Sequence, residues 1–377
     1  MKRREFLALS ATGIIGLGLS SFPLPLLAKG KRDKEYSLII LGDTHFDVDP
    51  PSVYHSNYME KTDWLNKVQR SEFARNGEMW KDRCPRLLQR ANQLIGKDTR
   101  MVLQMGDLIQ GDCGNAEVHK KMLSDALERM KGSLGGLPFV TVTGNHDVRG
   151  TNAKEAYHQF MPARMSQELG KTITKTTFGF NIGDDAYIFV DFNDPDDAEI
   201  DRLLDETKGA RHTFIVTHGP VFPSDDSSCR WILHGGASES ETEARHHFRQ
   251  AFAQRNAIVL CGHTHCTDFM DWYGDGGRIT QMTMCSVWTS DKQKKYTVRS
   301  EGADQYGMLR EKARQSPDGA NMKDERPLFD EYRPGIRQHT NSTSRGCYKL
   351  NVSRKHVTID FYAGDSQDLS HQFVIRD

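Results

Sequence analysis

The chain has 377 residues, of which 37% are hydrophobic and 27% are charged, proportions that exclude a disordered protein and suit one large globular domain or a domain with an insertion. The formal net charge of −1 provides no global basic field of the kind that attracts proteins to nucleic acids. Seven cysteines without a C-x-x-C pair exclude a disulfide scaffold.

The N-terminus predicts an export signal. Residues 3–7, Arg-Arg-Glu-Phe-Leu, resemble the twin-arginine signature. An apolar stretch covers residues 6–27, so we expect residues 1–28 to be a signal peptide that is cleaved after Ala28. This predicts delivery by the twin-arginine export machinery to the periplasm or another extracytoplasmic compartment, with no stable membrane insertion after cleavage. A retained membrane anchor is the alternative, because the stretch is nearly long enough to span a bilayer.

Short apolar runs bounded by glycine-rich turns predict β-strands along the rest of the chain. Helical patterns lie between several of them, and strands that alternate with helices predict α/β layering. The late strands have no helices between them, which predicts an antiparallel part. The predicted strands are Tyr36–Leu41, Met101–Met105, Phe139–Val142, Ala186–Val190, Thr213–Val216, Ala257–Leu260, Ile279–Met284, Tyr348–Val352 and Val357–Tyr362. The predicted helices are a stretch near Glu72–Leu94 interrupted at Pro85, then Glu117–Leu134, Ala198–Glu206 and Thr242–Gln254.

Two segments depart from this alternation. Residues 290–344 are polar, charged and short of aliphatic clusters, with one expected helix near Asp304–Arg314. We interpret them as an insertion in a domain of residues 35–289 that residues 345–377 complete with further strands. The polar loop at residues 47–75 has two interpretations, a cap over the substrate or a solvated surface loop.

Five short polar motifs directly follow predicted strands. Their glycines allow sharp turns and close approach of ions, and the carboxyl ends of strands are where α/β active sites form. Residues i and i+2 at a strand end point to the same side, so Asp43 and His45 can reach one metal ion together. Each motif alone is most often a turn or a polar loop, but five together indicate a site. The motifs are Gly42-Asp43-Thr44-His45, Gly106-Asp107, Gly144-Asn145-His146-Asp147, Thr217-His218-Gly219-Pro220 and Gly262-His263-Thr264-His265.

The order of these motifs resembles the calcineurin-like metallophosphoesterase superfamily from Asp43 to His265. The resemblance implies an α/β (α+β) fold, a four-layer sandwich of two mixed β-sheets flanked by helices. It also implies a centre of two transition-metal ions. The ligand sets that it implies are Asp43, His45 and His265 for the first ion, Asn145, His218 and His263 for the second, and Asp107 as a bridge between them.

The same resemblance implies a dinuclear-metal-dependent hydrolase of a small phosphoester, either a diester or a monoester. A metal-bound hydroxide would be the nucleophile, since two ions both activate water and neutralise the anionic substrate. His146 would be no ligand but a proton donor, and the neighbouring Asp147 would orient it. Mixed imidazole, carboxylate and amide ligation suits manganese, iron or zinc better than calcium.

A metal-dependent nuclease and a non-catalytic metal-binding relative are the alternative functions. The near-neutral charge and the absence of a basic aromatic groove weigh against a nucleic acid as substrate or partner. The presence of all seven expected ligands and of His146 weighs against a non-catalytic protein. Gln110 stands where purple acid phosphatases carry a tyrosine, which argues against that branch. Arg149 is a further candidate for contact with a phosphate, and His234 either contacts substrate or lies in a surface loop.

Overall fold

A computed structural model describes residues 35–58, 62–224, 229–286, 295–316 and 322–377. The predicted export signal, residues 1–28, lies outside these residues. None of the helices in the described ranges combines the length and the hydropathy needed to cross a bilayer.

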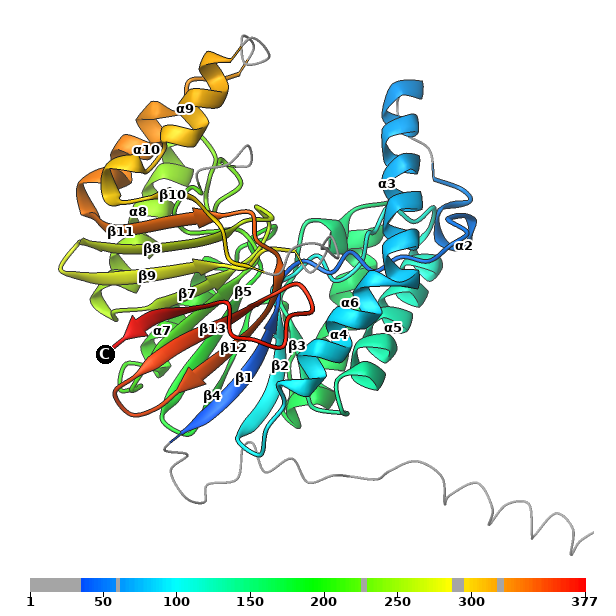
Figure 1. Cartoon of the computed structure of the whole chain (residues 1–377), viewed down its shortest axis with the longest axis horizontal. Helices are drawn as coiled ribbons and strands as arrows, with labels where there is room; N and C mark the ends of the chain where they lie inside the picture. Colours follow the sequence, from blue (N-terminus) through cyan, green and yellow to red (C-terminus); the bar gives the residue numbers. More distant parts are fainter. Residues whose placement is uncertain (1–34, 59–61, 225–228, 287–294, 317–321) are drawn as a thin grey trace, which may run out of the picture.

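Two mixed β-sheets form the centre of the fold (Figure 1). In the first sheet, with the order β14-β13-β12-β1-β2-β3, the strands β1, β2 and β3 are parallel and the others pair antiparallel. This antiparallel half is what the absence of helices between the late strands predicts. The bounds are β1 Tyr36–Leu41, β2 Thr99–Gln104, β3 Phe139–Thr141, β12 Gly346–Val352, β13 Val357–Ala363 and β14 His371–Arg376.

The second sheet has the order β10-β11-β8-β9-β7-β6-β5-β4, and β5, β6, β7 and β9 run parallel. Residues of β5 alternate between its two faces, as expected for a strand buried on both sides. Tyr187 and Phe189 face the core between the sheets, and Ile188 and Val190 face the helices. The bounds are β4 Phe178–Ile182, β5 Asp185–Val190, β6 Thr213–Thr217, β7 Ile258–Cys261, β8 Thr267–Gly274, β9 Gly277–Thr283, β10 Val298–Glu301 and β11 Ile336–Ser342.

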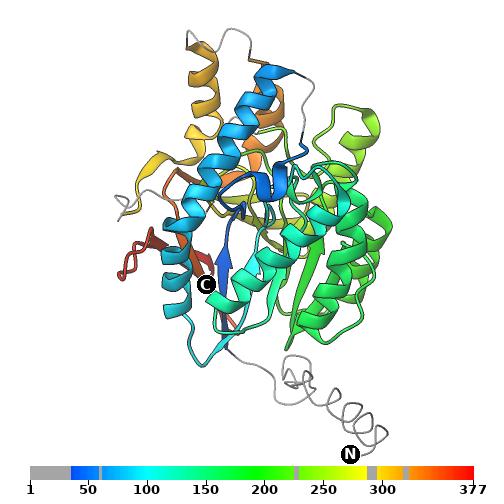
Figure 2. The same cartoon turned by 90° about the vertical axis from the view of Figure 1, so that its right-hand side faces the viewer.

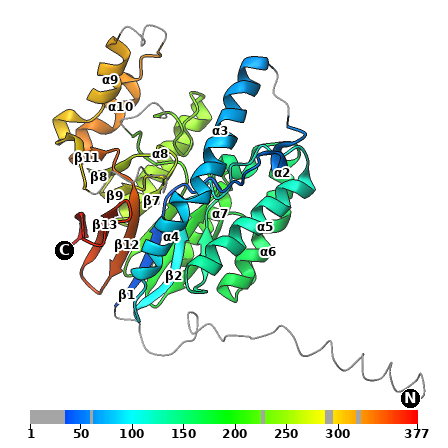
Figure 3. The same cartoon turned by 45° about the vertical axis from the view of Figure 1, so that its right-hand side comes forward.

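Helices cover the outer face of each sheet and complete the predicted four-layer sandwich. Helices α4, α5 and α6 pack on the first sheet and α7 and α8 on the second (Figures 1 and 3). Helices α3 and α9 project on the same side of the molecule (Figure 2). The bounds are α2 Ser52–His55, α3 Asp63–Lys81, α4 Arg83–Gln93, α5 Ala116–Ser133, α6 Ala153–Leu169, α7 Asp197–Glu206, α8 Glu239–Gln254, α9 Met308–Gln315 and α10 Arg326–Tyr332. The short 3-10 turns are η1 His146–Val148, η2 Ala303–Gln305 and η4 Arg333–Gly335.

Several elements differ from the sequence prediction. The predicted helix break at Pro85 occurs at Asp82 instead, since a proline in the first turn of α4 removes no intrahelical hydrogen bond. Helix α6 was not predicted, although its buried residues follow one face; it contains Pro162, which signals a helix break in a sequence. Strands β4, β8, β10, β11 and β14 were also not predicted. Of these, β8 and β11 bury polar side chains such as Asp268 and Asn341, which break the apolar signal.

Residues 295–316 and 322–344 are joined to the second sheet. Strand β10 pairs with β11, and β11 pairs with β8. Tyr306, Phe329 and Tyr332 are buried in the apolar cluster on the outer face of this sheet. The Tyr306 hydroxyl donates to the carbonyl of Pro223 at 2.9 Å, which ties the segment to the loop that follows β6.

Candidate metal centre

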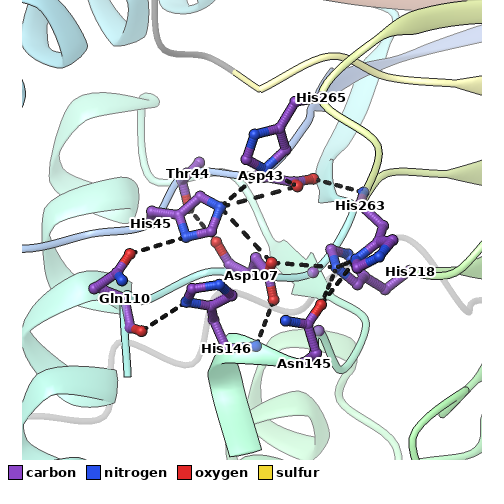
Figure 4. Close-up of polar contacts among 12 residues, drawn as sticks. Asp43, Thr44, His45, Asp107, Gln110, Asn145, His146, His218, His263 and His265 are labelled. Carbon is purple, nitrogen blue, oxygen red and sulfur yellow. Dashed lines mark hydrogen bonds and ion pairs between the residues drawn. The ribbon is translucent and has the colours of Figure 1, made fainter. Parts of the chain in front are cut away.

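The five motifs converge at one edge of the sandwich. Each follows the carboxyl end of a strand: β1, β2 and β3 of the first sheet, and β6 and β7 of the second. Figure 4 shows their side chains facing one another. The structure brings together all seven predicted ligands, which are Asp43, His45, Asp107, Asn145, His218, His263 and His265.

The first group consists of Asp43, His45 and His265. The Nε2 atom of His265 lies 2.9 Å from Oδ2 of Asp43 and 3.2 Å from Nε2 of His45. The His45 Nε2 atom lies 4.0 Å from the same Asp43 oxygen. One carboxylate oxygen and two imidazole nitrogens therefore face a common point.

The second group consists of Asn145, His218 and His263. The amide oxygen of Asn145 lies 2.8 Å from Nδ1 of His263 and 3.2 Å from Nε2 of His218. Those two imidazole nitrogens are 3.2 Å apart. This set pairs two nitrogen donors with one neutral oxygen donor, a combination suited to a transition metal.

Asp107 lies between the two groups. Its Oδ2 atom is 3.7 Å from Nε2 of His45 in the first group and 3.3 Å from Nε2 of His218 in the second. Its other oxygen, Oδ1, accepts a hydrogen bond of 2.7 Å from the backbone N–H of His146. The backbone thus fixes one oxygen while the other faces both groups.

Backbone strain accompanies this convergence. His45, Asp107, His263 and His265 have φ angles of 40°, 52°, 71° and 53°. Residues with a Cβ rarely adopt this left-handed region, and such strain concentrates at functional sites. Gly144 allows the second and third motifs to pack closely, because a Cβ at this position would lie 1.9 Å from the backbone nitrogen of Asp107.

Hydrogen bonds behind the ligands select which imidazole nitrogen faces the centre. The His218 Nδ1 donates to the carbonyl of Met105 at 2.6 Å, so the lone pair of a neutral ring is on Nε2. The His45 Nδ1 lies 3.2 Å from the amide oxygen of Gln110, which also accepts from Asn76 at 2.6 Å. Such partners are typical of metal-binding histidines. The buried Oδ2 atom of Asp43 accepts no hydrogen bond from the described residues although Nε2 of His265 lies 2.9 Å away, and nitrogen and oxygen donors converge in both groups, so the residues fit a metal ion in each group.

The pKa values of His45 and His263 agree with this interpretation, whereas that of His218 differs: burial lowers it, but Asp107 and Asp43 outweigh burial and raise the pKa to about 9. A bound cation would favour the neutral form of the His218 ring. Burial lowers the pKa of His45 well below its ordinary value, and burial together with His218 lowers the pKa of His263 to about 3. Both rings are therefore neutral, as a metal ligand requires. Burial raises the pKa of Asp107, but the nearby His218 and His146 outweigh it and hold the pKa well below its ordinary value. Asp107 is consequently an anion.

His146 lies at the rim of this centre, but its predicted orientation by Asp147 is wrong. Both carboxylate oxygens of Asp147 accept from backbone amides instead, Oδ1 from Ile109 at 3.1 Å and Oδ2 from Gly144 at 2.9 Å. Asp147 is fully buried and holds two motif loops together, and burial followed by Asp107 raises its pKa to about 8. The His146 ring is oriented by its Nδ1, which donates to the carbonyl of Gln110 at 2.8 Å.

Two residues that the motifs did not include complete this part of the site. The carbonyl of Gln110 orients the His146 ring, and the side chain of Gln110 orients His45. In the sequence, the position of Gln110 three residues after Asp107 was the signal that could have indicated this role. Arg149 places Nη1 3.2 Å from Nε2 of His146. The sequence marked Arg149 only by its proximity to the third motif.

His234 is not part of this centre. It is buried, its ring stacks on Phe248, and its Nε2 lies 3.1 Å from Asp197 at the start of α7. The interpretation as an exposed surface-loop residue is therefore wrong, and contact with the substrate stays a prediction.

Comparisons with known proteins agree with this geometry. The profile of the Metallophos family, described as calcineurin-like phosphoesterase, matches residues 36–267, more than half of the chain. A search of curated proteins finds no match.

Solved structures provide a likeness of fold. The structure of PhoD is similar with a TM-score of 0.50 and 10% identity, over 93% of this chain and 70% of that chain. GAP50, the anchor in the inner membrane complex of Plasmodium, has a TM-score of 0.47 and 11% identity, over 91% of this chain and 89% of that chain. A dimetal phosphatase from Danio rerio has a TM-score of 0.44 and 10% identity, over 90% of this chain and 98% of that chain.

Proposed function

Since this chain belongs to the calcineurin-like phosphoesterase family, we propose that it is a dinuclear-metal-dependent hydrolase of a small phosphoester. The observation that carries the proposal is the position of Asp107, whose Oδ2 faces both ligand groups. A single carboxylate oxygen between two groups of donors suits two cations better than one. Both phosphodiesters and phosphomonoesters remain candidate substrates.

We assign the ions by the groups that would hold them. Asp43, His45 and His265 would bind the first ion, Asn145, His218 and His263 the second, and Asp107 both. Manganese, iron and zinc suit these donors. Bound ions would neutralise charge on the phosphoryl group and lower the pKa of a coordinated water.

The chain's own residues provide the remaining chemistry. In its neutral form His146 donates from Nδ1 to Gln110 and accepts from Arg149 at Nε2. Proton donation to a leaving group therefore requires the imidazolium form, in which Nε2–H is released from Arg149 towards substrate. We propose that His146 protonates the leaving oxygen and that Arg149 donates a hydrogen bond to a phosphoryl oxygen. Asp147 would act indirectly, by fixing the two loops that carry Asp107 and His146.

A hydrolysis panel on metal-reconstituted protein tests this function. It compares a chromogenic phosphodiester with the matching monoester, then nucleotides, phospholipid headgroups and single-stranded DNA. We expect turnover of at least one small ester that is lost on chelation and restored by manganese, iron or zinc. Turnover of single-stranded DNA alone would favour a nuclease, and no turnover at all would favour a non-catalytic relative.

We also propose export by the twin-arginine machinery to the periplasm or another extracytoplasmic compartment, from the signature in residues 3–7. That route carries folded proteins, so metal loading can precede export. The domain limits remain our interpretation of the sequence, with residues 290–344 as an insertion in the catalytic domain.

A further inference from the structure

Two aromatic side chains lie beside the second ligand group. The ring of Trp231 is 5.3 Å from that of His263, with an interplanar angle of 30°. The ring of Phe192, which follows β5, lies 5.9 Å from His263 and 5.5 Å from His218. Neither residue belongs to the motifs from which the function is proposed.

The exposure of Trp231 requires an explanation. Its surface is 54% exposed, although a tryptophan gains more than most side chains from burial. Among the large apolar residues that are exposed in the described ranges, Trp231 is the one with a ring contact to a candidate metal ligand. A lone exposed aromatic residue is ordinary, but one at the rim of a catalytic centre presents an open ring face where a substrate must enter.

Phe192 is held in place by the backbone of the fourth motif. It packs at the margin of the outer apolar cluster of the second sheet. A Cβ at Gly219 would lie 2.5 Å from Cδ2 of Phe192, so glycine is needed there for this ring to pack against the chain next to His218. The ring of Phe192 is therefore packed against the loop that carries the ligand His218.

The centre is thus asymmetric. Its His45 side carries polar donors, with the His146 ring 4.5 Å from that of His45 and Arg149 beyond it. Its His263 side carries the two aromatic rings. A phosphodiester bound between the ligand groups would direct its leaving oxygen towards the donors and the substituent that phosphorus retains towards the rings.

We propose that Trp231 and Phe192 recognise an aromatic or heteroaromatic ring on the substituent that phosphorus retains, so that the substrate class is phosphodiesters with an aryl or nucleoside group. This inference rests on the proposed function. Stacking of a flat ring on the exposed indole face would remove apolar area from water on both partners. It also tolerates different rings, because every base or aryl group offers a π-face.

A kinetic comparison tests the inference on the metal-loaded protein. The 4-nitrophenyl ester of phenylphosphonate is compared with that of methylphosphonate, which has the same leaving group and lacks the ring, and the 4-nitrophenyl ester of a nucleoside 5′-phosphate forms a third arm. We expect Trp231→Leu to lower the ratio of kcat/KM for the phenylphosphonate ester to that for the methylphosphonate ester by about tenfold, through KM. Trp231→Phe should restore most of the ratio. The third arm distinguishes a nucleoside from a simple aryl group, since a nucleoside substrate should show the larger loss.

Tyr273→Leu is the matched control, because Tyr273 is an aromatic residue that is 43% exposed near the far end of β8 from the site. It should leave the ratio at the wild-type value. A ratio for Trp231→Leu within twofold of wild type would overturn the inference. Loss of metal in that variant together with equal losses on both esters would instead mean that the substitution disturbs His263, on which Trp231 packs. In that case Phe192→Leu, with metal content measured, provides the second test of ring preference.

A binding measurement separates this inference from the proposed function. Phenylphosphonate and methylphosphonate carry a C–P bond that the enzyme cannot hydrolyse, and calorimetry gives their Kd values. Tighter binding of phenylphosphonate that Trp231→Leu abolishes would support ring recognition even if no ester were hydrolysed, and only the hydrolase proposal would then fail. Equal binding of both phosphonates to the wild-type protein would overturn ring recognition even if hydrolysis were observed.

Discussion

Arg149 faces His146 across the rim of the centre, with Nη1 3.2 Å from Nε2 of the imidazole. The rest of the guanidinium is held by the buried carboxylate of Asp112, whose oxygens lie 2.9 Å and 2.8 Å from Nε and whose Oδ2 also accepts from Nη2. A bidentate pair of this kind fixes the plane of the guanidinium. Burial lowers the pKa of His146, and Arg149 lowers it further against the opposing effect of Asp107. In the absence of substrate the imidazole is therefore neutral and accepts from Arg149.

This geometry predicts a binding role for Arg149. Arg149→Ala should raise KM for a phosphoester about tenfold or more, because a charge-assisted hydrogen bond to phosphate is worth about 1.5–3 kcal/mol. Arg149→Lys should recover little, since an ammonium cannot keep both the pair with Asp112 and the contact with His146. Steady-state kinetics with metal content as the control measure both. A KM equal to that of wild type in Arg149→Ala would exclude contact with the substrate.

His146→Ala should keep both metal ions and lose most turnover. Loss of a proton donor typically reduces the rate by about 100-fold to 10,000-fold. The deficit should be smaller for a nitrophenyl ester than for an alkyl ester, because a nitrophenolate needs less protonation. Equal deficits would favour stabilisation of transition-state charge instead. His146 also lies close enough to His45 and Asp107 to form a third potential ligand group, so loss of metal in the variant would identify it as a ligand.

Asp107→Asn should reduce the occupancy of both ions, since the neutral amide weakens a ligand that faces both groups. Elemental analysis after reconstitution measures the content. Asp191→Asn is the control, because Asp191 is a fully buried carboxylate at the end of β5 and takes no part in the potential ligand groups. If Asp107→Asn bound two ions and turned over substrate at the wild-type rate, the assignment of Asp107 as the bridging ligand would be wrong.

We predict that His119 contributes to the loss of folding stability at low pH. It is fully buried, and burial lowers its pKa below the ordinary value, against the hydrogen bond to the carbonyl of Asp147. In the unfolded chain His119 binds a proton below a pH of about 6.5, whereas in the folded chain it is protonated only at a lower pH. The free energy of unfolding therefore falls as the pH falls. His119→Gln keeps a donor for Asp147 but does not titrate. Its urea midpoint should decline less than that of wild type between about pH 7.5 and 5.5, and parallel curves would contradict the assignment.

Replacing Arg3 and Arg4 by lysine should retain the protein in the cytoplasm, because the paired arginines carry the predicted export signature. Cell fractionation with immunoblotting measures the distribution. Export at the wild-type level would point to the general secretory route.

The sequence determined the elements that local patterns encode. Strands such as β1 and β13 are apolar runs, and the ligand-type residues follow strands directly, so their order along the chain indicated both the sandwich and the site. The side chains gather because the carboxyl ends of parallel strands meet at one sheet edge. The resemblance of the motif order to a known family added the expected division of the ligands into two groups.

Only the tertiary structure decided which partners surround these residues. Strand β8 buries Asp268 because Ser224 and Asn341 donate to it, and those partners lie 44 and 73 residues away in the chain. Adjacency to His146 suggested Asp147 as its partner, but the η1 turn directs Asp147 towards backbone amides and leaves His146 to Gln110 and Arg149. The contact of Trp231 with His263 likewise comes from packing between separate loops. A side chain's direction and its non-local neighbours are set by how the elements pack, and no short window of sequence encodes that packing.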